Sequence, residues 1–230
     1  MNCWWCHNPE SRKSGIERPS HSQYPGKDEL IGREVSVNEV MTELQKDRIF
    51  YDQSGGGVTF SGGEPLLQPE FLSALLNACH EAGLHTVVDT SGLADRSDFK
   101  RVAEIVDLFL YDLKLADDEL HRENVGASNQ LILDNLRYLV QNNKKVRVRV
   151  PLIPTITDTE QNLVTVADFI KSLDKQIPVD LLPFNLLARD KFQRFNLNNR
   201  LKSMATQAST KLEQMSQIFT ERGIAVSIGG

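Results

Sequence analysis

Hydrophobic positions follow two different periods along the chain, and their succession predicts helices and strands in alternation. Residues 36–39 have the capping-box sequence Ser-Val-Asn-Glu, and apolar side chains recur behind it at helical spacing. The period changes at 57–60, a short apolar run typical of a buried strand. Further strands are predicted at 86–88, 108–111, 146–150, 179–182 and 224–228. Further helices are predicted at 69–82, 96–106, 131–140, 160–173 with Asp158 or Thr159 as its N-cap, and 200–222.

This succession of elements predicts an α/β fold. Strands that are almost continuously apolar, separated by helices, are typical of a parallel sheet covered by helices. The sequence has no linker, low-complexity stretch or break in composition, so residues 1–230 are expected to form a single domain. Residues 8–34 are polar and lack a clear period, which predicts a long loop of the kind that often carries function.

Composition and charge exclude several classes of protein. The chain has 230 residues, of which 40% are hydrophobic and 25% charged, as in ordinary globular proteins. A net charge of -5 argues against a nucleic-acid partner, since such binding requires a basic face. No apolar run approaches the roughly 18–20 residues of a membrane span, and the N-terminus does not resemble a signal peptide. Three cysteines argue against a disulfide scaffold, so we expect a cytoplasmic protein without a membrane partner.

Polar residues gather in or just after the carboxyl ends of five predicted strands. In a parallel barrel these ends meet on one face, where active sites lie. Each group also has a simpler explanation, because the glycines could serve a turn, Asp89 could cap a helix, and Lys114 could be a solvated charge. Their joint placement favours a functional site. The five groups are 61–64, Asp89 with Thr90, 112–114, Arg149 and Asn185.

The N-terminal sequence Cys3-Trp4-Trp5-Cys6-His7 places two thiols on one turn, which suits a metal or a redox pair. Zinc or iron–sulfur sites need about four ligands, or three and a substrate. Cys79 lies on the apolar side of a predicted helix and is expected in the core. A thioredoxin-type motif would follow a strand, and none precedes this one. The scattered histidines are expected at the surface or in the core; they are His21, His80, His85 and His121.

Taken in order, these motifs resemble the glycyl-radical-enzyme activating enzymes of the radical S-adenosylmethionine (SAM) superfamily, whose archetype activates pyruvate formate-lyase. Residues 3–10 resemble the segment that begins with the last two cysteines of the family's Cys-x3-Cys-x2-Cys motif. Residues 54–65 resemble the signature strand and Gly-Gly-Glu turn. Later motifs match in order at 89–92, 111–114, Arg149 and 181–184.

The resemblance implies a partial parallel (β/α)6 TIM-like barrel and a defined chemistry. Three cysteines, here including Cys3 and Cys6, hold a [4Fe–4S] cluster whose open iron binds SAM. Reductive cleavage of SAM gives a 5′-deoxyadenosyl radical, which takes hydrogen from a glycine of a partner glycyl-radical enzyme. The electron donor would be a flavodoxin or ferredoxin. Residues 8–60 contain no cysteine, so the ferredoxin-like insert of many relatives is not expected.

The motif positions also imply a SAM site. Gly62 and Gly63 would let the backbone approach the methionine part, and Glu64 would pair with its ammonium group. The segment from Asp112 through Leu113 to Lys114 would contribute as well. Lys114 or Arg149 would pair with the SAM carboxylate.

Other positions are expected at the nucleoside end of SAM or beside it. Trp5, Cys6 and His7 would lie along the adenine. Asn185, where the archetype has histidine, would bond to the ribose or adenine. Oxygen ligands for a cation beside SAM would come from Asp89, Thr90 and Asp112.

The start of the chain departs from the family pattern. The leading cysteine would lie four residues before Cys3, and the barrel's first strand would precede it, so we expect a fragment or a late start. With two cysteines the cluster would be incomplete and the chain inactive. One alternative is a degenerate homologue that binds SAM or the partner without a cluster. Another is a barrel lyase that uses Lys114 as a Schiff-base nucleophile.

Overall fold

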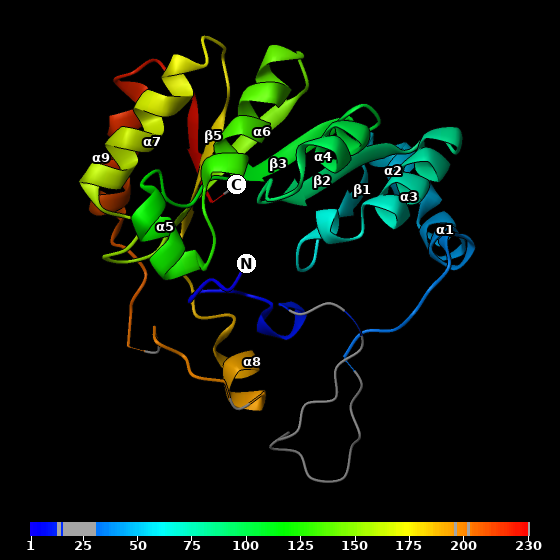
Figure 1. Cartoon of the computed structure of the whole chain (residues 1–230), viewed down its shortest axis with the longest axis horizontal. Helices are drawn as coiled ribbons and strands as arrows, with labels where there is room; N and C mark the ends of the chain where they lie inside the picture. The colour runs from blue at the N-terminus through cyan, green and yellow to red at the C-terminus, as the bar shows by residue number, and fades with distance from the viewer. Residues whose placement is uncertain (13–14, 16–30, 196, 202, 230) are drawn as a thin grey trace. The chain divides into compact units, whose positions relative to one another are not determined.

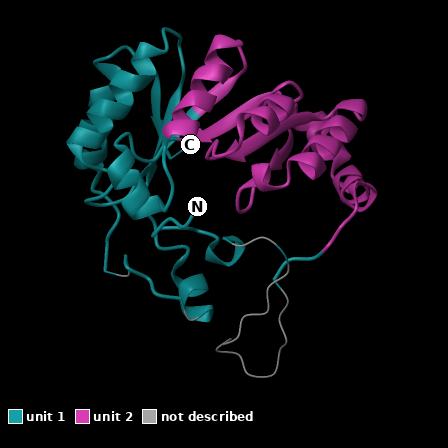
Figure 2. Cartoon of the chain, viewed as in Figure 1, with its two compact units in different colours: residues 1–33, 113–129, 148–230 teal, residues 34–112, 130–147 magenta. Residues whose placement is uncertain are grey.

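A computed structural model of the chain describes residues 1–12, 15, 31–195, 197–201 and 203–229. The described chain forms two compact units, which Figure 2 colours separately. Unit 1 contains residues 1–33, 113–129 and 148–230, and unit 2 contains residues 34–112 and 130–147. Most of the predicted 8–34 loop lies outside the described residues.

The strands form a six-stranded sheet in which they follow one another in chain order. Within unit 2, Val58 of the first strand lies opposite Thr86 of the second, in parallel register. Within unit 1, Val148 lies opposite Val179 in the same sense. The predicted parallel α/β architecture is therefore confirmed. The strands are β1 (Gly57–Phe60), β2 (His85–Thr90), β3 (Leu108–Asp112), β4 (Val146–Leu152), β5 (Val179–Pro183) and β6 (Val226–Ile228).

Three helices of unit 2, at 69–81, 96–103 and 130–141, bury apolar side chains, whereas those at 37–46 and 48–54 contain no buried residue. The predicted capping box forms at the start of the first helix, where the Ser36 hydroxyl accepts from the Glu39 amide and the Glu39 side chain accepts from the Ser36 amide. Cys79 is fully buried with Val58 and Leu84, as predicted. These helices are α1 (Val37–Lys46), α2 (Arg48–Ser54), α3 (Pro69–Glu81), α4 (Arg96–Ala103) and α6 (Gln130–Gln141), with the 3-10 turn η2 (Pro65–Leu67) (Figure 1).

The helices of unit 1 differ most from prediction. The helix expected at 200–222 begins only at Ser209, after an irregular segment whose Gln207 side chain bonds inside the unit. Two short polar helices in this unit were not predicted because they present no sustained apolar stripe. Thr159, rather than Asp158, caps the helix that follows it. The helices are α5 (Asp118–Val125), α7 (Glu160–Ser172), α8 (Arg189–Arg194) and α9 (Ser209–Thr220), with the 3-10 turn η1 (Pro9–Ser11).

Gly92 shows why a backbone position in unit 2 requires glycine. Its φ is +74°, in the region that other residues rarely adopt. A Cβ atom there would also lie 1.7 Å from the Tyr111 hydroxyl, which donates to the Ile132 carbonyl at 2.6 Å.

In the part of the chain that is described, no helix has both the length and the apolarity to cross a bilayer.

Candidate functional site

In unit 2 the Gly-Gly-Glu turn is joined to the end of β2 through the Glu64 carboxylate. Its Oε1 accepts from the Thr90 hydroxyl at 2.6 Å and from the Leu66 amide at 3.2 Å. Its Oε2 accepts from the Ser91 amide at 2.9 Å and from the Ser91 hydroxyl at 2.5 Å. Four donors of the chain therefore surround this one carboxylate. Sequence reasoning assigned it to an ammonium group and missed Ser91, whose role has no sequence signal.

A second bond joins the same two strand ends, because the Ser61 hydroxyl donates to the Asp89 carboxylate at 3.0 Å. Gly62 has a φ of +125°, and the space around its missing Cβ is open. Its requirement for glycine is thus conformational, and the exposed Gly62–Gly63 backbone is held between two side chains bonded to β2.

The loop after β2 is fixed by a buried amide that sequence reasoning did not single out. Asn135 of α6 donates to the carbonyl of Gly92 at 2.9 Å and to that of Ala94 at 3.0 Å. These bonds hold the backbone that follows Thr90 and Ser91. Asp112, another expected site residue, is the last residue of β3 and is half-buried.

In unit 1 the Cys-x-x-Cys segment forms a tight turn. The Cys6 amide donates to the Cys3 carbonyl at 3.2 Å, and the Arg12 guanidinium donates to the same carbonyl at 2.5 Å. The segment is anchored to the end of α5, where the Trp4 amide donates to the Asn124 carbonyl at 3.3 Å. Cys3 is buried, Cys6 is half-buried, and neither is in a disulfide. The turn can present two reduced thiols together.

Beside this turn lies an open pocket. Its lining includes Trp5 and His7 from the cysteine segment and Asn185 from the loop after β5. The structure thus brings together three residues that the sequence assigned to one end of SAM. Trp4 and Phe184 add aromatic surface to the lining.

Helix α8 holds the segment that follows the cysteines, which sequence reasoning did not anticipate. The Lys191 ammonium donates to the Asn8 side chain at 2.6 Å and pairs with the Glu10 carboxylate at 2.7 Å. The Arg12 guanidinium lies 5.6 Å from the centre of the Phe192 ring. These contacts fix residues 8–12, which follow the Cys3–Cys6 turn in the sequence.

Lys114 and Arg149 also belong to unit 1. Lys114 is only 8% exposed, and its carbonyl accepts from the Asn162 side chain at 3.1 Å. Arg149 lies inside β4, which continues to Leu152, so its expected place at a strand end is wrong. The reason is that Pro151 does not end the strand. Leu113 is buried in the core, and its amide donates to the Arg149 carbonyl at 2.9 Å.

The donor set for a metal is incomplete among the described residues. They contain no group of three or more histidine, cysteine, aspartate or glutamate side chains placed to hold a metal ion. Cys3 and Cys6 alone therefore do not match the three thiolates that a [4Fe–4S] cluster of the expected kind requires. At the expected cation site, the Thr90 hydroxyl donates its hydrogen to Glu64 and accepts from the Gly92 amide at 2.8 Å, which leaves one oxygen lone pair for another contact.

Comparisons with known proteins bear on this arrangement. The family model for the radical SAM superfamily matches residues 1–169. The chain is 32% identical to a trans-4-hydroxy-L-proline dehydratase activating enzyme of Clostridioides difficile, over 100% of this chain and 90% of the relative. It is also 32% identical to a pyruvate formate-lyase-activating enzyme of Clostridium pasteurianum, over 96% and 86% of the two chains. A solved domain of a pyruvate-formate lyase-activating enzyme from Bacteroides vulgatus has a TM-score of 0.65 and 35% identity, covering 76% of this chain and 99% of that one.

Proposed function

Because the chain belongs to the glycyl-radical-enzyme activating enzymes of the radical SAM superfamily, we propose that it installs a glycyl radical on a partner enzyme. The family uses a [4Fe–4S] cluster and SAM, as the sequence motifs predict, and has the partial (β/α)6 barrel fold. When bound, the reduced cluster supplies the electron that cleaves SAM. The chain is therefore a radical SAM oxidoreductase of the activase kind.

The observation that carries the proposal is the pocket beside the Cys3–Cys6 turn. It is open to solvent and is lined by Trp5, His7 and Asn185. Stacking on Trp5 and a hydrogen bond from Asn185 would orient the adenosine part of SAM. Cys3 and Cys6 would hold the cluster next to it.

The sequence motifs imply contacts to the methionine part of SAM for residues of unit 1 and, separately, for residues of unit 2. In unit 1, the buried Lys114 ammonium and Arg149 would pair with the carboxylate. In unit 2, the Gly62–Gly63 backbone would contact the amino-acid portion. Glu64 supports that turn through its four hydrogen bonds rather than by an open carboxylate.

A cation site is proposed within unit 2. Asp89, Thr90 and Asp112 would supply oxygen atoms to a cation next to SAM. Asp89 already accepts a bond from Ser61, which orients its carboxylate.

The partner is proposed to be a glycyl-radical enzyme like pyruvate formate-lyase, with a flavodoxin or ferredoxin as electron donor. Relatives at the same 32% identity are named for two different partners, pyruvate formate-lyase and trans-4-hydroxy-L-proline dehydratase. The test incubates the protein, including any residues encoded upstream of Met1, with SAM, reductant and each of these two enzymes under anaerobic conditions. A glycyl-radical signal in the electron paramagnetic resonance spectrum of one of them is expected. Cleavage of SAM without a radical on either would refute both as partners.

We further propose that residues 1–230 by themselves lack activity, because they supply two thiolates. Anaerobic reconstitution of this chain should give less than one intact cluster per molecule by absorbance and iron analysis. A protein that binds SAM but never forms a cluster, even with any residues encoded upstream of Met1, would support the binding-only alternative. Trapping of a carbonyl substrate on Lys114 by borohydride would support the lyase alternative, which the family comparisons do not favour.

A further inference from the structure

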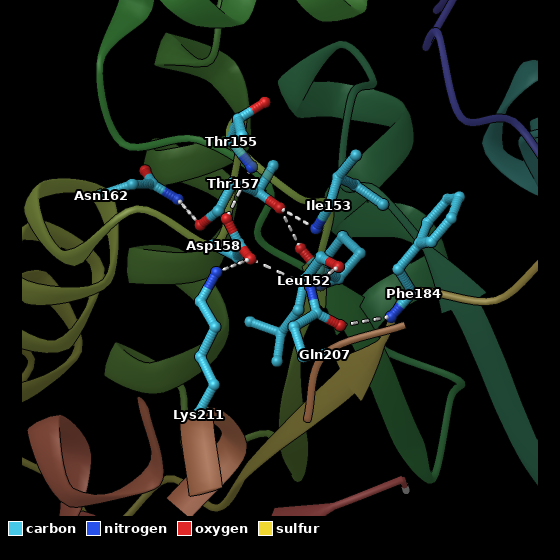
Figure 3. Close-up of polar contacts among 10 residues, drawn as sticks. Leu152, Ile153, Thr155, Thr157, Asp158, Asn162, Phe184, Gln207 and Lys211 are labelled. Carbon is cyan, nitrogen blue, oxygen red and sulfur yellow. Dashed lines mark hydrogen bonds and ion pairs between the residues drawn. The ribbon is translucent and has the colours of Figure 1, made fainter. Parts of the chain in front are cut away.

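Residues 153–158 form the turn after β4 in unit 1. Their polar groups bond to one another and to the end of β4, and we call this turn the hub. The Thr157 hydroxyl accepts from the Ile153 amide at 2.6 Å and donates to the Pro151 carbonyl. The Thr155 amide donates to the Asp158 carboxylate at 2.7 Å, and Thr155 has a φ of +64°. Asp158 is buried, and Figure 3 shows its carboxylate at the centre of these contacts. A backbone in the left-handed region persists only where its surroundings fix it.

Asn162 of α7 joins this hub to the loop after β3. Its side-chain nitrogen donates to the Thr157 carbonyl at 2.8 Å and to the Lys114 carbonyl at 3.1 Å. Its side-chain oxygen accepts from the Ala116 amide at 3.0 Å. Both donors and the acceptor are thus used, and two of the three bonds join residues 46 and 48 positions apart in the sequence. An aliphatic side chain of the same size could make none of these bonds.

Gln207 joins the same hub to the loop after β5. Its side-chain nitrogen donates to the Asp158 carboxylate at 3.0 Å and to the Leu152 carbonyl at 2.8 Å. Its side-chain oxygen accepts from the Phe184 amide at 3.1 Å (Figure 3). The pairing of β4 with β5 ends at Leu152 and Pro183, so Gln207 links the last paired residue of β4 to the residue that follows β5.

Lys211 of α9 completes the arrangement by pairing with Asp158 at 2.7 Å. Because Asp158 accepts both from Lys211 and from Gln207, it fixes which way the Gln207 amide faces. With its nitrogen committed to Asp158 and Leu152, the amide must present its oxygen to Phe184.

We propose that Asn162 and Gln207 are positioning residues for the two ends of SAM. This inference rests on the proposed function, in which Lys114 serves the carboxylate and Asn185 serves the adenosine. Asn162 holds the backbone of Lys114, and Gln207 holds the residue before Asn185. Both are bonded to the 153–158 turn, so the spacing of the two loops is set by two side-chain amides, of which Asn162 is buried and Gln207 half-buried.

Hydrogen–deuterium exchange of the full chain tests, without any ligand, whether Asn162 and Gln207 hold the two loops. Asn162→Leu should speed exchange at the amide of Ala116 at least about tenfold, and Gln207→Met should do the same at Phe184, each leaving the other site unchanged. The matched control is Gln217→Met, because Gln217 on α9 makes a comparable 2.8 Å bond to Glu221 at the surface. The control should alter neither site. If exchange is equal in all variants, or if each variant loses protection throughout the chain, the proposal that these two amides hold the loops is wrong.

Adenosine titration tests the link to function, because Trp4 and Trp5 are the only tryptophans in the chain and both line the pocket. Adenosine should change their fluorescence, and Gln207→Met should raise the Kd at least about tenfold. Asn162→Leu should leave the Kd within about twofold, a selectivity that general destabilisation would not produce. If adenosine does not change the fluorescence of the unsubstituted chain, the proposed adenosine pocket is wrong. The exchange experiment still tests whether the two amides hold the loops. An unchanged Kd in Gln207→Met would overturn the positioning role.

Discussion

Glu64→Gln should destabilise unit 2, because an amide cannot replace a carboxylate that accepts four hydrogen bonds. The two backbone donors, the amides of Leu66 and Ser91, approach opposite oxygens of the carboxylate. The single oxygen of glutamine can serve only one of them, and both residues are buried. One unpartnered amide costs about 1–3 kcal/mol, and the loss of charge weakens the bonds that remain. We therefore expect a loss of about 2 kcal/mol in the free energy of unfolding.

Thermal unfolding followed by circular dichroism measures this loss. In a chain of this size, about 2 kcal/mol lowers Tm by roughly 4–8 °C. Glu43→Gln is the matched control, because Glu43 pairs with Lys46 at the surface of α1 and both side chains are more than half exposed. Such pairs contribute less than about 1 kcal/mol. A Tm for Glu64→Gln that equals the Tm of the control would refute the reasoning.

Three further predictions concern buried groups. Burial lowers the pKa of His121, so the stability that its neutral form contributes is present above the unfolded pKa of about 6.5 and is lost as the pH falls below that value. In His121→Gln, the free energy of unfolding measured with urea should therefore depend less on pH between about pH 7 and 5. An unchanged pH dependence would contradict this. Gly92→Ala should lower Tm because its Cβ would overlap Tyr111, whereas Gly83→Ala, with open space around it, should lower Tm less; equal losses would contradict the overlap. Burial raises the pKa of the Cys79 thiol, so maleimide should label Cys6 before Cys79 in the native chain, and the reverse order would count against the described core.

The sequence predicted those parts of the fold that local patterns determine. The capping box at 36–39 and the apolar run at 57–60 became α1 and β1 at the expected places. Short helices such as α5 and α8 were missed, because their stability comes from contacts with distant residues rather than from an apolar stripe. Lys191 of α8, for example, bonds to Asn8 and Glu10.

The sequence motifs singled out Trp5, His7 and Asn185, and the structure places all three at one pocket. Their contact with SAM stays a prediction. The amides that hold the surrounding loops were not predictable. Asn162 and Gln207 bond to backbone atoms 48 and 23 residues away, and a single asparagine or glutamine in a sequence gives no sign of such a partner. Likewise, the four donors around Glu64 depend on how β1 and β2 end side by side.

The central claim, that this chain belongs to an enzyme that cleaves SAM reductively, is tested most directly by quantifying 5′-deoxyadenosine. The protein, with any residues encoded upstream of Met1, is reconstituted anaerobically with iron and sulfide and then given SAM and a reductant. The account predicts equal amounts of 5′-deoxyadenosine and methionine from the unsubstituted protein and from Cys79→Ala, and none from Cys6→Ser. Absence of 5′-deoxyadenosine from a protein that carries an intact cluster, or its undiminished formation by Cys6→Ser, would contradict the account.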